Sequence, residues 1–278
     1  MSDNPGGSIG DPRMSLVPPV PSLESLLQTF ETDFGDDSAH ARLFRKYTVG
    51  RKVADLGCGH GFSTFYLSVN AKETVGFDVD PEGIGFANSL VRRFGSVNVS
   101  FHLFDGGFTG YSDGYFQVVV SSDVIEHTNS PKVHLGEAFR LCAREGLLLL
   151  STPNGLISNG DPKIIRSHSV YHVTEYSPSQ LGGLVQESGF DIERTFRQIR
   201  TRKKTNAVQD FVTRIVLLRN NVLGAERVSI FNRMKFLYRL KKNLKMTDGI
   251  TSYELIECSL RDITSSNCDA IVVVARKK

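Results

Sequence analysis

The stretch Val53-Ala-Asp-Leu-Gly57-Cys-Gly59-His-Gly61-Phe-Ser63 decides the fold. Its apolar start predicts a short buried strand, its glycines predict a tight turn, and the residues after Gly61 predict a helix start. Glycine is needed where the backbone passes close to a ligand or takes a positive φ, and a helix start offers free N–H groups. This order of elements predicts a ligand site at the end of a parallel strand.

Short apolar runs alternate with helical stretches on both sides of this motif. Buried strands are predicted at residues 53–56, 74–77, 97–103, 116–120, 147–151, 190–196 and 270–275. Helices are predicted at residues 23–30, 39–47, 63–69, 81–94, 131–143 and 178–188. Such alternation indicates βαβ units. The expected fold class is therefore α/β: a Rossmann-like, seven-stranded, mostly parallel sheet with helices on both faces.

The composition predicts one globular domain with two appendages. The chain has 278 residues, of which 40% are hydrophobic and 23% charged, and this length can bury a sizeable core. Residues 1–21 hold five prolines and three glycines but no charged segment followed by an apolar core, so we expect a disordered leader and no signal peptide. We assign residues 22–199 and 251–278 to the α/β domain, and residues 200–250 to a basic helical insertion or lid.

Two further features bear on localisation. No run approaches the ~20 apolar residues of a membrane span. The four cysteines contain no CxxC pair, which is typical of ordinary thiols in a reducing compartment. We therefore expect a cytoplasmic protein, which a basic surface could hold at the periphery of a membrane.

Positive charge is concentrated in residues 200–245. This segment holds thirteen Lys or Arg residues against two acids, a local charge of +11 in a chain whose net charge is +3. Its apolar residues recur at intervals of three or four, as on helices. The charge predicts an anionic partner: RNA, an anionic membrane surface, or an anionic or lipid-linked acceptor. The alternatives are a solvated basic face, or burial of the apolar residues in the core or a homodimer.

Two more predicted strands end in aspartates. Asp78 ends the second strand, in Val75-Gly-Phe-Asp78-Val-Asp80-Pro81, and Asp105 follows the third, in Phe104-Asp105-Gly106. A carboxylate at Asp78 is placed to accept two hydrogen bonds from a ribose diol. The Asp105 carboxylate is placed to accept from an adenine amino group.

The glycine spacing distinguishes between nucleotide cofactors. The G-x-G-x-G pattern departs from the G-x-G-x-x-G of dinucleotide sites, where the helix start binds a pyrophosphate. Asp55 lies two positions before the first glycine, and its carboxylate would repel a diphosphate. A cationic ligand without phosphate fits better, which favours S-adenosyl-L-methionine over NAD.

The motifs resemble, in order and spacing, those of the class I S-adenosylmethionine-dependent methyltransferases. The resemblance runs through residues 55–61, 76–78, 105, 123–127 and 147–154, covers roughly residues 40–197 with the final strand, and is closest to the branch of ubiquinone-biosynthesis O-methyltransferases and of sugar and natural-product methyltransferases. Gln117 replaces an aspartate usual in the family, and Arg144-Glu145-Gly146 replaces the usual proline-glycine-glycine turn. The predicted cofactor contacts are Asp55, Gly57, Cys58, Gly59, Gly61, Asp78, Val79, Asp105, Gly106 and Ser122.

The predicted catalytic residues are His127, His172 and Glu175. Methyl transfer to oxygen is an in-line displacement that needs positioning and often a base. His127 follows the fourth strand, at the sheet edge beside the cofactor, and imidazole titrates near neutral pH. His172 and Glu175 precede a helix that Ser177 is expected to cap, at the end of a long loop that suits a lid. A purely structural role for these residues is the alternative.

A second resemblance points to a different acceptor. Small-RNA 3′-terminal 2′-O-methyltransferases carry E-x-x-E-H, S-T-P-N and H-x-x-E-W, and this chain has similar stretches at residues 123–127, 151–154 and 172–176. That resemblance implies a divalent metal on Asp123, Glu126, His127 and His172, acting on the acceptor hydroxyl. The interpretation as a small-molecule O-methyltransferase assigns no metal.

We therefore expect an S-adenosylmethionine-dependent methyltransferase (EC 2.1.1.-) that methylates oxygen on a sugar, a glycan-linked molecule or another small biosynthetic acceptor. The alternative is metal-dependent 2′-O-methylation of an RNA 3′ end. A non-catalytic cofactor-binding module is less well supported, because the glycines and acids of the site are all present.

Overall fold

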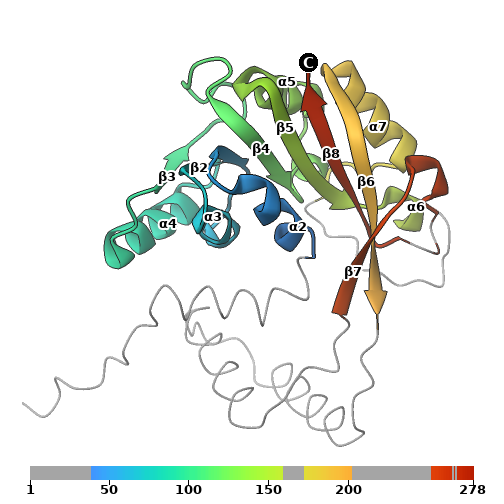
Figure 1. Ribbon diagram of the computed structural model, residues 1–278, viewed down its shortest axis with the longest axis horizontal. Coiled ribbons are helices and arrows are strands. Elements are labelled where there is room, and N and C mark those ends of the chain that lie inside the picture. Colours follow the sequence, from blue (N-terminus) through green and yellow to red (C-terminus); the bar gives the residue numbers. More distant parts are fainter. Residues whose placement is uncertain (1–38, 159–171, 202–251, 265, 267) are drawn as a thin grey trace, which may run out of the picture.

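A computed structural model describes residues 39–158, 172–201, 252–264, 266 and 268–278 (Figure 1). Within them, one sheet has the strand order β3-β2-β1-β4-β5-β8-β6-β7. The strands are β1 (Lys52–Leu56), β2 (Glu73–Asp78), β3 (Val99–Leu103), β4 (Phe116–Ser122), β5 (Cys142–Pro153), β6 (Phe190–Thr201), β7 (Ser252–Glu257) and β8 (Ala270–Lys277). The Rossmann-like α/β fold expected from the sequence is confirmed.

The first five strands are parallel to one another, and the last three join the sheet through antiparallel pairings. β1 pairs with β2 and β4, β2 with β3, and β4 with β5, all in parallel. β8 lies between β5 and β6 and is antiparallel to both, and β6 is antiparallel to β7. The carboxyl ends of β1 to β5 therefore meet at one edge, where loops can build a common site.

The sheet has eight strands where seven were expected. The additional strand is β7, which pairs with β6 and, among the described strands, lies at the edge of the sheet. Its sequence Ser-Tyr-Glu-Leu-Ile-Glu is short and half polar, which suits an edge strand but gives little hydrophobic signal. β6 also continues through Thr201, so the first two residues assigned to the basic insertion belong to the sheet.

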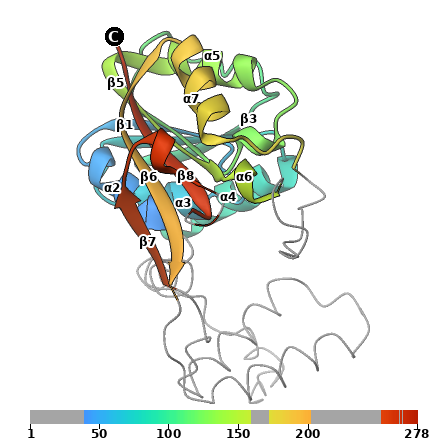
Figure 2. The same cartoon turned by 90° about the vertical axis from the view of Figure 1, so that its right-hand side faces the viewer.

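Helices cover both faces of the sheet, as Figures 1 and 2 show. They are α2 (Ala39–Thr48), α3 (Phe62–Ser68), α4 (Pro81–Phe94), α5 (Pro131–Leu141), α6 (Gly155–Ser158) and α7 (Pro178–Glu187), with short 3-10 helices η3 (Ile125–His127) and η4 (Leu260–Asp262). Alternate strand residues face opposite cores: Val119 packs with the α5 and α7 side, and Val118 with the α2 and α3 side. Burial on both faces explains the continuous apolar strand sequences.

Local signals set the helix ends. The Asp80 side chain accepts from the backbone N–H groups of Glu82 and Gly83 at the start of α4, and Gly95 ends that helix in a left-handed conformation. Ser177 forms the expected N-cap of α7, as part of a capping box with Gln180. α5 ends at Leu141 and not at residue 143, because Cys142 already pairs with Phe116 of β4.

Several sequence expectations lie outside the described residues. They are the leader at 1–21, the helix at 23–30, most of the lid loop (residues 159–171) and the basic segment from 202 to 251. In the part of the chain that the structure describes, no helix is both long and apolar enough to cross a membrane.

Candidate active site

The glycine turn after β1 is shaped by three left-handed residues: Gly57 (φ +83°), Gly59 (φ +53°) and Gly61 (φ +83°). A Cβ on Gly57 would lie 2.4 Å from a methyl carbon of Val124, and one on Gly61 would lie 2.6 Å from the Phe101 ring. A Cβ on Gly59 would meet no atom within 4 Å. Gly57 and Gly61 therefore serve close packing, whereas Gly59 leaves open space on the ligand side of the turn.

The Asp78 carboxylate is fixed at the end of β2 by two backbone amides. Its Oδ2 accepts from Gly59 N at 2.6 Å, and its Oδ1 accepts from Asp80 N at 2.9 Å. A carboxylate has about four acceptor positions, so each oxygen keeps capacity for a ligand hydroxyl. The arrangement ties the glycine turn to β2 and orients the carboxylate as the sequence predicts for a ribose diol.

Residues next to Asp78 and after β3 are exposed. Val79 is an apolar side chain with 64% of its surface exposed. Asp105 is also exposed, its Oδ1 accepts from Gly107 N at 2.8 Å, and the position of a Cβ on Gly106 is open. Val79, Asp105 and Gly106 are thus accessible at the positions that the sequence predicts for the adenosine. We call residues 57–61, 78–80 and 105–106 the cofactor edge.

Asp55 lies beneath the glycine turn and is 1% exposed. Its Oδ2 accepts from the hydroxyls of Thr64 (2.7 Å) and Ser63 (3.3 Å) in the first turn of α3. Burial raises the pKa of its carboxyl to about 6, so most of it is ionised at neutral pH. The neighbouring Cys58 thiol is buried, which raises its pKa. Asp55 therefore places negative charge under the turn, while Cys58 stays a neutral packing group.

The segment after β4 carries backbone strain beside the cofactor edge. Asp123 has φ +54°, a conformation that costs a non-glycine residue on the order of 1–2 kcal/mol and is often found at functional sites. Its Oδ1 accepts from the Ser151 hydroxyl at 3.0 Å, and the same hydroxyl is 3.1 Å from Ser122 Oγ. Ser122 and Asp123 are thus connected to β5 by hydroxyl contacts.

His40, which the sequence analysis did not select, lies against this segment. It belongs to α2, is 6% exposed, and its Nε2 is 3.5 Å from Asp123 Oδ2. Its Nδ1 donates to the buried side chain of Gln198 on β6 at 3.1 Å. The contacts span 83 and 158 positions of sequence, and a single histidine in an amphipathic helix gives no local signal of them.

Glu126 is a buried carboxylate at the same edge. It is 1% exposed, and its Oε2 accepts from Thr152 Oγ1 at 2.9 Å. Burial raises the pKa of this carboxyl to about 7, and the nearby Asp123 adds to the shift. Its other oxygen, Oε1, has no hydrogen-bond partner among the described residues.

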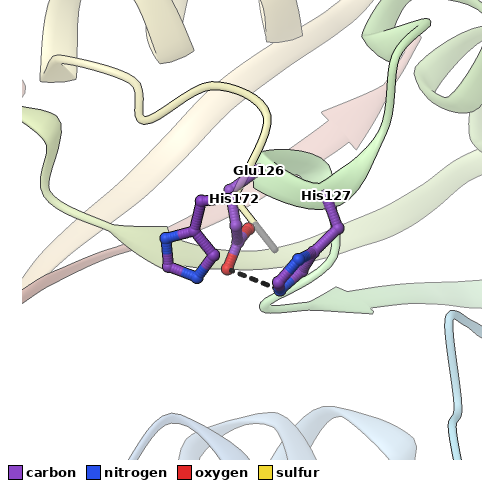
Figure 3. Close-up of side chains that lie close together, drawn as sticks. All are labelled: Glu126, His127 and His172. Carbon is purple, nitrogen blue, oxygen red and sulfur yellow. Dashed lines mark ion pairs between the residues drawn. The ribbon is translucent and has the colours of Figure 1, made fainter. Parts of the chain in front are cut away.

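Two histidines lie beside this carboxylate (Figure 3). His127 Nε2 is 3.9 Å from Glu126 Oε1, and the rings of His127 and His172 meet edge to face with centroids 4.8 Å apart. His172 Nδ1 donates to Glu175 Oε1 at 2.9 Å. The structure therefore gathers the three predicted catalytic residues around Glu126. We call residues 122–127 and 172–175 the acceptor edge.

The metal-ligand set implied by the RNA-methyltransferase resemblance is brought together only in part. Glu126, His127 and His172 offer ligand atoms within 4.8 Å of one another. Asp123 is not in this group, because its carboxylate is turned toward Ser151 and His40.

The chain is similar in sequence to known methyltransferases. The profile of a methyltransferase domain family matches residues 36–195. A probable S-adenosylmethionine-dependent methyltransferase of Mycolicibacterium smegmatis is 27% identical over 147 residues, which cover 53% of this chain and 54% of that protein. A ubiquinone biosynthesis O-methyltransferase of Methylococcus capsulatus is 28% identical over 106 residues, covering 38% and 45%. The chain thus spans about half the length of the curated relatives it matches.

A solved structure extends the likeness to the fold. The crystal structure of an S-adenosylmethionine-dependent methyltransferase from Mesorhizobium loti aligns with a TM-score of 0.52 at 13% identity, covering 88% of this chain and all of that one. At this identity the likeness concerns the fold alone.

Proposed function

This chain belongs to the methyltransferase domain family, and we propose that it transfers a methyl group to a hydroxyl oxygen of a small biosynthetic acceptor. Its cofactor is S-adenosyl-L-methionine, whose sulfonium supplies an electrophilic methyl group when bound. We assign the ribose hydroxyls to Asp78, the adenine to Val79 and Asp105, and the cationic methionyl part to the side of the turn that covers Asp55.

One observation carries the proposal: the cofactor edge and the acceptor edge are in direct contact. Gly57 of the glycine turn packs so closely on Val124 that a Cβ would come within 2.4 Å of its side chain. His127 follows three residues later, and its side chain is 40% exposed. A histidine at this place is within reach of an acceptor that enters next to the cofactor, as an in-line displacement requires.

We assign to His127 the removal of the acceptor proton. The acceptor O–H bond breaks and its proton passes to the imidazole. The oxygen lone pair forms the new O–C bond, while the C–S bond breaks and its electron pair stays on sulfur. Positive charge thus moves from the sulfonium to the imidazolium, next to the carboxyl group of Glu126.

Two lines of support favour an oxygen acceptor that carries negative charge. Among the relatives is a protein named as a ubiquinone biosynthesis O-methyltransferase. The sequence between residues 200 and 245 has a local charge of +11, which would attract an anionic or lipid-linked acceptor.

A second candidate is 2′-O-methylation of an RNA 3′ end. The specific observation in its favour is that three of the four residues which that resemblance implies, Glu126, His127 and His172, lie close together.

The test is an acceptor screen with radiolabelled S-adenosyl-L-methionine. Sugars, catechol-type quinone precursors and short RNAs are offered to the full chain, and the labelled product is characterised by hydrolysis and mass spectrometry. We expect label on the oxygen of one of the small-molecule classes. Label on RNA would replace the first candidate by the second, and label on nitrogen or sulfur would contradict both.

A further inference from the structure

The loop between β3 and β4 carries the adenine end of the cofactor edge. It runs from residue 104 to residue 115, and four of these twelve residues are glycines. Glycine has more backbone conformations open to it than other residues, so such a loop loses much entropy when it takes one form. Asp105 lies near the start of this loop. Its position therefore depends on the contacts that anchor the loop to the rest of the molecule.

The first anchor comes directly before Asp105. The Phe104 N–H donates to the Asp78 carbonyl at 2.9 Å, and the buried Phe104 ring packs edge to face on Phe77 of β2. The Asp105 carboxylate accepts from Gly107 N at 2.8 Å, within the same segment. A contact of this kind shapes the turn but does not hold it against another element. One end of the segment is thus fixed, and the other end needs a second anchor.

The second anchor is an ion pair on α5, formed by Glu137 and Arg140. Glu137 Oε1 accepts from both the backbone N–H and the hydroxyl of Thr109, at 2.8 Å each. Arg140 donates to both Glu137 oxygens at 2.7 Å, a forked geometry that a lysine cannot copy. The Glu137 side chain is 4% exposed, so solvent screens this pair less than a surface ion pair.

Arg140 also contacts the loop on both sides of Thr109. Its guanidinium carbon lies 4.3 Å from the centre of the Phe108 ring. Its Nη1 donates to the Tyr111 carbonyl at 2.6 Å and to the Asp113 carboxylate at 2.7 Å. One side chain of α5 thus gathers much of the loop, and the bridge that carries Asp105 is only a few residues long.

We propose that Glu137 and Arg140 are positioning residues for the base of the cofactor. By holding the loop at Thr109, they set the Asp105 carboxylate where it accepts from the adenine amino group, and they thereby make the site specific for adenine. The inference rests on the assignment of the adenine to Asp105 in the proposed function, and it holds for any acceptor. A base with a carbonyl in place of the amino group would face the carboxylate with a second acceptor, so neither group would find a donor.

The test compares the binding of two thioethers by calorimetry, on the full chain and without an acceptor. S-adenosyl-L-homocysteine carries the amino group, and S-inosyl-L-homocysteine carries a carbonyl oxygen at that position. We expect the unaltered chain to prefer the adenine compound by about 10–100-fold, the usual cost of an unpaired polar group. In Arg140→Gln and in Glu137→Gln the preference should fall to about threefold or less, because the carboxylate is no longer held at the base. Thr109→Val, which removes one hydroxyl of the anchor and keeps its N–H, should lie between.

A matched control separates positioning from stability. Phe139 is the neighbour of Arg140 on α5, and its ring packs on Phe190 of β6 with the centroids 5.2 Å apart. Phe139→Leu should lower the midpoint of chemical denaturation and keep the full preference for adenine. Circular dichroism checks that every variant is folded. Thr109→Val, at a half-buried position of the loop, keeps the test decisive if a substitution on α5 prevents folding.

The outcomes separate the inference from the assignment of Asp105. Asp105→Ala should also lose the preference, because it removes the acceptor itself. Loss in Asp105→Ala with full preference in both ion-pair variants overturns the inference and keeps the assignment. Loss in Phe139→Leu overturns it as well, since any weakening of α5 would then have the same effect. No preference in the unaltered chain overturns both the inference and the assignment, whereas the proposed methyl transfer is decided by the acceptor screen.

Discussion

The cofactor edge and the acceptor edge lie side by side but differ in how their polar groups are satisfied. At the cofactor edge, both Asp78 oxygens accept backbone N–H groups, and Asp80 caps the helix that follows it. At the acceptor edge, Asp123 takes a left-handed conformation, and Glu126 has a buried oxygen without a hydrogen-bond partner among the described residues. The first edge is complete before a ligand arrives. The second stores strain and desolvation that a bound acceptor would relieve.

The largest effect is expected at the acceptor edge. His127→Ala should reduce turnover by about 10²–10⁴-fold, the usual contribution of a group that assists proton removal. The affinity for S-adenosyl-L-methionine should change by less than about twofold, because His127 lies outside the cofactor edge. Steady-state kinetics and calorimetry on the same preparation measure both. Turnover within about tenfold of the unaltered enzyme would make His127 structural.

A second variant, Gly57→Ala, should affect the cofactor edge and the acceptor edge together. Gly57→Ala adds a Cβ at φ +83° that meets the Val124 side chain at 2.4 Å. The backbone strain costs about 1–2 kcal/mol and the overpacking about 1–3 kcal/mol. We expect a lower midpoint in chemical denaturation together with loss of cofactor affinity and turnover. Adding Val124→Ala should restore only the packing part, since the strain remains. Full rescue by the double variant would show that the positive φ is unimportant.

Acid should act with opposite sign on two buried groups that lie behind the edges, His134 on α5 and Asp55 on β1. Burial lowers the pKa of His134, which contacts Ser121 of β4, to about 4. Stability from neutral His134 is complete above pH 6.5 and is lost as pH falls toward 4, by about 3 kcal/mol at most. The Asp55 pKa is raised to about 6, so protonation of Asp55 stabilises the folded state as pH falls from 6 toward 4. Denaturation of His134→Asn between pH 7 and 4 should show a smaller acid loss, and Asp55→Asn a larger one. Identical slopes in all three proteins would contradict both assignments.

The smallest effect is expected at the cofactor edge, on the affinity for S-adenosyl-L-methionine. Asp78→Ala should weaken S-adenosyl-L-methionine by about 1.5–3 kcal/mol, about 10–150-fold, through lost hydrogen bonds to the ribose and a looser glycine turn. Calorimetry gives the cofactor affinity, and an unaltered value would remove Asp78 from the site. Preferential binding of NAD would contradict the cofactor itself.

The cofactor edge could be predicted from the sequence because its turn, cap and strand-end signals are local. Asp78 and Asp80 follow a strand directly, and the turn and cap signals act within a few residues. The end of α5 shows where local signals fail. The sequence predicts a helix through residue 143, because nothing in it separates a helix end from a strand that starts at once at Cys142.

The acceptor edge could be predicted only as a set of residue types. Glu126 and His172 are 46 positions apart, and only the fold brings them together. Sequence alone did not distinguish Asp123, which turns away, from Glu126, which turns inward. His40 could not be predicted from the sequence either, because its partners are distant in sequence and lie on β6 and after β4. β7 was missed because an edge strand needs few apolar residues.

The position of β8 has a consequence for the order in which the molecule assembles. Among the described strands β8 comes last in sequence, but it lies between β5 and β6 in the sheet. During synthesis, β1 to β5 and their helices can pair as they emerge, whereas β6 and β7 have no place on the sheet until residues 270–277 have been translated. A nascent chain that stops before Ala270 would expose the free edge of β5, an unpaired strand open to association with other chains.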